Sequence, residues 1–144
     1  MFTPSRTQAR DLFFDTWEKY RAGQPLEGLE NKVIEVVLLH PEFHAVLENR
    51  KKNRDHDYTP EPGAQNPFLH LSLHLAVAEQ LAIGQPPGIA ELLNDLTAKH
   101  GDRHVALHVV LECLGATVWQ ANQSGSPPDQ HAYLTCLREH ADKA

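Results

Sequence analysis

The chain consists of segments with apolar residues at helical spacing, separated by short polar segments rich in glycine, proline and asparagine. Apolar side chains that recur every three or four residues lie along one face of an α-helix. By this pattern the sequence predicts helices over about residues 5–22, 26–50, 66–83, 86–100, 102–122 and 128–141. Because no clear strand pattern is present, we expect an all-α, single-domain helical bundle of five to seven helices.

Several of the expected helix ends carry recognisable signals. Asn66 followed by Pro67 is typical of a helix start, and Asp102 is a typical N-cap. Two questions stay open in the second helix. Pro41 either kinks that helix or begins a new turn, and the β-branched residues of 33–37 also permit a strand.

Residues 51–65 contain two aspartates, two prolines and a glycine, and we expect a long loop there. No other stretch has the composition of a linker. A chain of 144 residues has the length of one domain with one core, so a single domain over residues 1–144 is predicted.

Composition and charge argue against two classes of partner. The formal net charge of −6 disfavours nucleic-acid binding, because attraction to phosphate requires a basic surface. The one basic run, residues 50–54, is followed at once by Asp55 and Asp57, and we interpret it as part of the solvated loop. No apolar stretch approaches the roughly 20 residues of a membrane span, and residues 1–6 lack the apolar core of a signal peptide. We therefore expect a cytoplasmic protein with no nucleic-acid and no membrane partner. A homo-oligomer stays open, and no substrate is indicated.

The two cysteines, Cys113 and Cys136, are too few and too widely spaced for a disulfide framework or a zinc knuckle. Both fall in segments with helical spacing. We expect them to be small core residues of a protein in a reducing compartment.

Histidine carries the strongest chemical signal in the chain. Six of the ten histidines form three pairs with the same i, i+4 spacing. The pairs are His40/His44, His70/His74 and His104/His108. On a helix this spacing puts two imidazoles on one face, one turn apart. Imidazole is the commonest metal ligand in proteins, so the pairs suggest a metal site without indicating a substrate or a reaction.

Two of the pairs are expected to lie at one height in the bundle. The helices over 66–83 and 102–122 are joined through a third helix by short turns, so they should begin at the same end. Each carries its histidine pair in its first turns. Glu112 follows His108 by one turn and shares the face of that pair. That face continues to Trp119, which suggests that it turns inward.

One divalent ion would satisfy four inward imidazoles and a carboxylate together, whereas unpaired buried polar groups cost roughly 1–3 kcal/mol each. The predicted metal ligands are His70, His74, His104, His108 and Glu112, the last as a ligand or a base. This mixture of donors suits Zn, Fe, Mn or Ni, and spacing alone does not choose among them. For His40 and His44 a surface or helix-end role is more common than ligation. We expect the side chains of His56, His131 and His140 to face solvent.

Three functions are compatible with this pattern. The first is a metal-binding helical protein, with redox or hydrolytic catalysis as one form of it. The second is a non-catalytic structural or interaction module whose histidines form a hydrogen-bond network. The third, metal-free acid–base catalysis by a histidine, lacks a visible nucleophile or substrate pocket. The chain has no HExxH zinc-protease helix, no Glu-x-x-His pair of di-iron bundles and no glycine-rich phosphate loop, and whether it is an enzyme stays open.

Short motifs distributed along the chain resemble one known family. The most distinctive is Asn-Pro-Phe-Leu-His-Leu-Ser-Leu-His over 66–74. The others lie at 2–6, 20–26, 40–42, 57–60, 85–89 and 112–114. Together they resemble the bacterial proteins described as domain of unknown function 1841, and the likeness covers almost the whole chain. The resemblance implies a soluble bacterial protein, and it implies no activity and no site residue.

Overall fold

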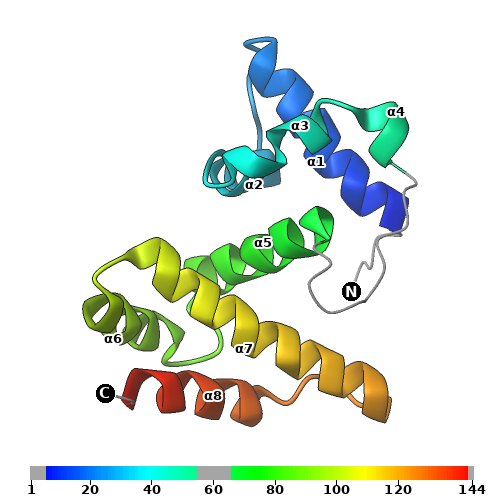
Figure 1. Ribbon diagram of the computed structural model, residues 1–144. Coiled ribbons are helices and arrows are strands. Elements are labelled where there is room, and N and C mark those ends of the chain that lie inside the picture. Colours follow the sequence, from blue (N-terminus) through cyan, green and yellow to red (C-terminus); the bar gives the residue numbers. More distant parts are fainter. Residues whose placement is uncertain (1–5, 55–65, 143–144) are drawn as a thin grey trace. The chain divides into compact units, whose positions relative to one another are not determined.

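The computed structural model describes residues 6–54 and 66–142 (Figure 1). In these two ranges the chain forms eight α-helices and one short 3₁₀ helix, with no strand. The elements are α1 (Arg6–Arg21), α2 (Leu29–Leu38), η1 (Pro41–Phe43), α3 (His44–Leu47), α4 (Arg50–Asn53), α5 (Pro67–Ile83), α6 (Ile89–His100), α7 (Arg103–Ser124) and α8 (Gln130–Asp142). The all-α prediction is confirmed, and the predicted count of five to seven helices is too low.

The extra helices come from residues 26–50, where the sequence left open whether Pro41 kinks one helix or begins a new turn. α2 ends at Leu38, and Pro41 then begins η1, so the proline divides the segment rather than kinking it. α3 and α4 have four residues each. A single helical turn is too short to show a periodic pattern in the sequence. α4 lies partly inside the expected loop over 51–65, of which 55–65 lie outside the described residues.

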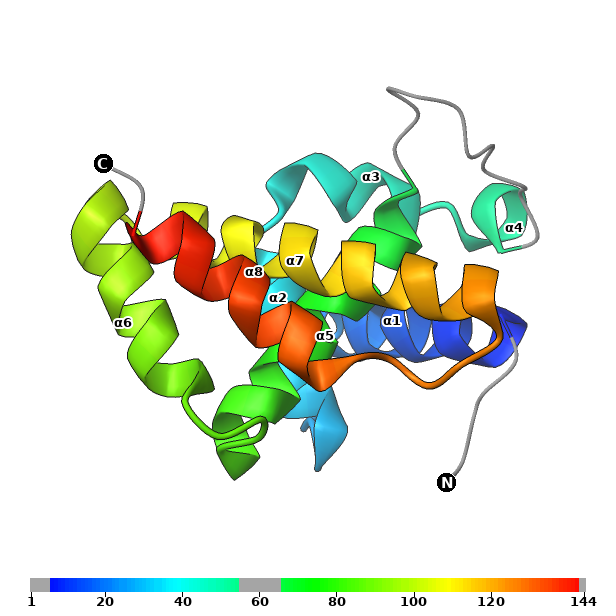
Figure 2. The same ribbon diagram turned by 90° about the horizontal axis from the view of Figure 1, so that it is seen from below.

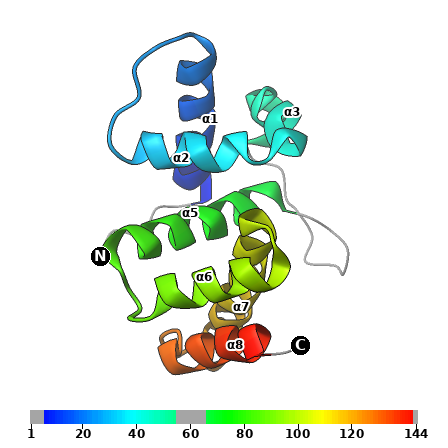
Figure 3. The same ribbon diagram turned by 90° about the vertical axis from the view of Figure 1, so that its left-hand side faces the viewer.

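The chain divides into two compact units, Met1–Leu75 and Ala76–Ala144, and the boundary falls inside α5. In the first unit α2 runs across α1 (Figure 3). Aromatic and aliphatic side chains fill the space between them, and the rings of Phe14 and Phe68 lie 5.4 Å apart between centroids. The core of this unit consists of Phe13, Phe14, Trp17, Val33, Ile34, Val36, Val37, Phe43, Leu47, Phe68, Leu71 and Leu75. That the whole chain is a single domain stays a prediction.

Arginine contacts hold α4 against α1 in the first unit. The buried guanidinium of Arg10 donates to the carbonyl oxygens of Asn53 (3.3 Å) and Arg54 (3.1 Å) at the end of α4. Asp11 accepts from Arg54 Nε and from Arg50 Nη2, both at 2.9 Å. The basic run therefore forms a helix with an acidic partner, rather than the solvated loop that its composition predicts.

In the second unit α6, α7 and α8 each pack against the other two, and α7 and α8 run antiparallel side by side (Figures 1 and 2). Asp102 begins α7 as expected, because its carboxylate accepts from the backbone N–H groups of His104 and Val105. The hydroxyl of Tyr133 donates to Gln80 Oε1 at 2.8 Å, and burial raises the pKa of this tyrosine. Trp119 is 59% exposed, so the expectation that this end of its face turns inward is wrong.

A disulfide joins Cys113 on α7 to Cys136 on α8, with their Cα atoms 5.8 Å apart. The expectation of two separate core cysteines is therefore wrong. The two residues are 23 positions apart in the sequence, and the antiparallel packing of the two helices brings them together.

Among the described helices, none combines the length and the apolar character that crossing a membrane requires.

Replacing Asp11 by asparagine tests the contact between α1 and α4. Arg54, and then Arg50, lower the pKa of the Asp11 carboxyl from 3.8 to about 2. A lowered pKa means that the carboxylate stabilises the fold above pH 3.8 and that this stabilisation is lost as the pH falls towards 2. We expect Asp11→Asn to lower the free energy of unfolding at pH 7 by roughly 1 kcal/mol, because the ion pairs are partly exposed and screened.

Urea titrations at pH 7 and pH 3 measure this difference. The variant should lose less stability than the parent between the two pH values. Glu35→Gln, which changes an exposed carboxylate of α2, is the control and should follow the parent. If Asp11→Asn and the parent lose equal stability on acidification, the paired carboxylate does not hold α4 in place.

Candidate functional site

His70 and His74 lie one turn apart on the first half of α5. The side chain of Asn66 accepts from the backbone N–H groups of Phe68 (3.0 Å) and Leu69 (3.2 Å), and this cap sets the first turn of the helix. The two rings lie 5.0 Å apart between centroids, as their spacing predicts. His74 is buried and His70 is half-buried, so both imidazoles are largely withdrawn from water.

His40 lies in the short connection between α2 and η1, and its side chain is fully buried. Its Nδ1 lies 2.8 Å from the carbonyl oxygen of Val36. A carbonyl oxygen only accepts hydrogen bonds, so Nδ1 carries the proton and donates. In the neutral ring Nε2 then carries a lone pair, a tautomer that we infer from this bond. The end of α2 thus determines which nitrogen of His40 is available for another partner.

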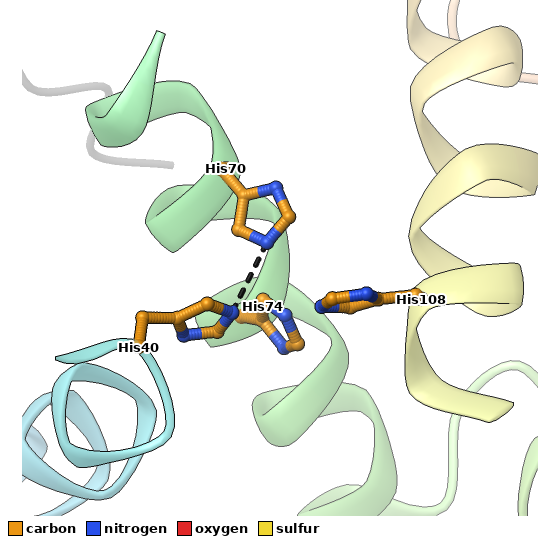
Figure 4. A group of neighbouring side chains, drawn as sticks. All are labelled: His40, His70, His74 and His108. Carbon is orange, nitrogen blue, oxygen red and sulfur yellow. Dashed lines mark hydrogen bonds between the residues drawn. The ribbon is translucent and has the colours of Figure 1, made fainter. Parts of the chain in front are cut away.

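The lone pair of His40 is directed at His70. The two Nε2 atoms lie 3.1 Å apart, and the dashed line in Figure 4 marks this hydrogen bond. The ring of His40 lies 4.8 Å from that of His70 and 4.4 Å from that of His74. We call His40, His70 and His74 the histidine trio. Each member offers a ring nitrogen within 4.8 Å of those of the other two, so the trio is a candidate metal site.

Phe43 closes one side of the trio. Its ring stacks on His40 and meets His70 edge to face, with both pairs of centroids 5.5 Å apart. Phe43 is itself buried and belongs to the core of the first unit. The trio is therefore continuous with the apolar core, and water has little access to the imidazole that is most deeply buried.

His44 does not join the trio, although it pairs with His40 in the sequence. Its Nε2 donates to the carbonyl oxygen of Val37 at 2.9 Å, and its ring packs 4.3 Å from the ring of Trp17. The i, i+4 rule applies to one continuous helix, and α2 ends at Leu38 before either histidine. The expected helix-end role fits His40, because its Nδ1 donates to a carbonyl in the last turn of α2. The alternative surface role is wrong, because His40 is fully buried.

The other predicted ligands belong to the second unit. His104 and His108 lie on α7 with ring centroids 4.3 Å apart, and both are half-buried. Glu112, one turn further along, is exposed. Figure 4 draws His108 as well. That these three residues share one site with His70 and His74 stays a prediction.

Comparison with known proteins gives a family without an assigned activity. The model of the family described as domain of unknown function DUF1841 matches residues 5–139. The chain belongs to this family. No curated protein and no solved structure matches it. For this DUF1841 protein, the chemistry of the site therefore rests on its own residues.

The tautomers of two neighbouring histidines provide a direct test of the site geometry. In the neutral, metal-free protein His40 should carry its proton on Nδ1, because the carbonyl of Val36 accepts from that atom. His44 should carry it on Nε2, because that atom donates to Val37. Two-bond ¹H–¹⁵N NMR spectra distinguish the tautomers, and His44 is the internal control with the opposite pattern. A proton on Nε2 of His40 would contradict the described site.

Proposed function

We propose that this protein binds a divalent metal ion through His40, His70 and His74. The observation that carries the proposal is the hydrogen bond from His40 Nδ1 to the carbonyl oxygen of Val36. Histidines that ligate metals usually donate their second ring N–H to a carbonyl or carboxylate, which orients the ring and selects the tautomer. His40 has this arrangement, and its Nε2 is directed at the rest of the trio.

The spacing of the trio also suits an ion. Zn–N bonds are about 2.0–2.1 Å long, so two nitrogen ligands of a tetrahedral ion lie roughly 3.3 Å apart. The Nε2 atoms of His40 and His70 are separated by 3.1 Å. An ion would take the place of the proton that the two nitrogens share, and His70 would then carry its proton on Nδ1.

The donor set indicates which ions to expect. Three imidazoles are nitrogen ligands of intermediate softness, which suit Zn, Ni and Fe better than Mn, because Mn prefers oxygen ligands. Three protein ligands also leave a position for water, as in catalytic zinc sites. Zinc-bound water ionises near neutral pH, so hydrolysis is the reaction class that such a site supports. His104, His108 and Glu112 stay candidates for further ligands on the strength of their spacing alone.

Metal titration of variants tests the proposal. The protein is purified without a histidine tag, with its disulfide intact so that no thiol is present, and titrated with Zn²⁺ after treatment with a chelator. We expect one equivalent to bind to the parent, and to be lost in His40→Gln, His70→Gln and His74→Gln. Zinc at about 100 times its Kd should raise the free energy of unfolding by about 2.7 kcal/mol.

Two controls make this result specific. His44→Gln removes an imidazole from the same unit and should keep its zinc, because that ring is engaged with Val37 and Trp17. Glutamine keeps a hydrogen-bonding side chain at each position of the trio, and circular dichroism checks that each variant is folded. Separate variants at His104, His108 and Glu112 test the ligands that only the sequence predicts. Full zinc binding by all three trio variants would contradict the proposal.

The alternative is a structural hydrogen-bond network without metal. The bond between His40 and His70 favours it, because two neutral imidazoles already satisfy each other there. On this alternative the parent binds no zinc at low-micromolar concentration, and its stability does not change when zinc is added. The trio variants would still be less stable, because each leaves a buried partner without its hydrogen bond.

A further inference from the structure

A second group of potential metal ligands lies wholly within the second unit. Cys113 is buried on α7, and Cys136 and His140 lie half-buried on α8. The sulfur atoms and a ring nitrogen of His140 all lie within 4.8 Å of one another. Cys136 and His140 are four positions apart on one helix, so they occupy the same face. His140, which was expected to face solvent, is half-buried and lies close to both cysteines.

The two cysteines have two alternative states. With the disulfide formed, each sulfur is bonded to the other and neither is a thiolate. After reduction, two thiolates and an imidazole form an S₂N donor set, which is characteristic of zinc sites with three protein ligands. No carboxylate or other hard ligand is needed to complete this set.

We propose that Cys113, Cys136 and His140 form a zinc site that exists only when the disulfide is reduced. A thiol reductant donates two electrons to the disulfide, which breaks the S–S bond, gives two cysteine thiols and leaves the reductant as its own disulfide. Zn²⁺ then displaces one proton from each thiol and binds both sulfurs and the imidazole of His140. The disulfide form of the reductant reverses the exchange: it accepts two electrons, leaves as two thiols, and the S–S bond of the protein forms again. Zn²⁺ is then released, because a sulfur bonded to sulfur is no longer a thiolate ligand.

The surface around the disulfide supports exchange with solution. A cavity of about 690 Å³ between α7 and α8 is lined by both cysteines, together with Thr117, Gln120 and Ala132. Cys136 is only half-buried, so a small thiol has a route to its sulfur. This proposal shares no residue with the histidine trio and does not rest on it.

Cobalt is the most direct probe, because Co²⁺ bound to thiolate gives a near-ultraviolet charge-transfer band that imidazole ligands do not give. The full chain is used with His74→Gln as background, which removes a member of the trio. It is reduced by a phosphine, which takes up the oxygen of water to become the phosphine oxide and leaves no competing thiol. We expect one equivalent of Co²⁺ to produce the band, Zn²⁺ to abolish it, and the oxidised protein to give none.

Variants on α8 test the ligands. Cys136→Ser should abolish the band, and His140→Gln should weaken Co²⁺ binding at least tenfold. His131→Gln, at an exposed position of the same helix, is the matched control and should bind as the parent does. A reduced protein without the band, or an unchanged affinity in folded His140→Gln, would overturn the proposal. Zinc binding by the trio in the oxidised parent is a separate outcome, so failure of one site does not obscure the other.

Discussion

A neutral imidazole has one donor and one acceptor nitrogen, and at His40 the end of α2 takes the donor. The carbonyl oxygen of Val36 lies in the last turn of α2 and accepts from the backbone N–H of Leu39 (3.2 Å) as well as from the ring of His40. The same bond orients the ring and leaves the lone pair of Nε2 directed at His70. The end of α2 thus orients the ring of His40. Among the described residues of the first unit, His40 is the only fully buried histidine.

Sequence patterns predicted the longer helices well and the shorter ones poorly. α5 and α7 begin where Asn66 and Asp102 indicate, because a cap is a local interaction that the sequence states directly. η1, α3 and α4 are held by contacts from other elements, such as the guanidinium of Arg10 on the last carbonyls of α4. Such contacts join residues more than forty positions apart and leave no periodic signal.

In the candidate sites, too, contacts within one helix were predicted and contacts between elements were missed. The pair of His70 and His74 was predicted, because both lie on one helix and its spacing applies. The burial of His40 beside His70 and His74 was not predicted. The rule that paired His40 with His44 applies to one continuous helix, and α2 ends before either residue. The disulfide was missed because helix spacing does not reveal which turns of α7 and α8 face each other. Cys136 and His140 have the same i, i+4 spacing as the histidine pairs. This spacing was visible in the sequence and could have indicated that the two side chains share a helix face.

X-ray absorption at the zinc edge of the loaded, disulfide-intact protein tests most directly whether the histidine trio binds metal. Imidazole ligands give a first shell of nitrogen at about 2.0–2.1 Å, together with the outer-shell scattering of rigid rings. The account predicts at least three imidazoles in the parent and a loss of imidazole scattering in His40→Gln. A shell of oxygen atoms without ring scattering, or a spectrum that is the same in parent and variant, would contradict it.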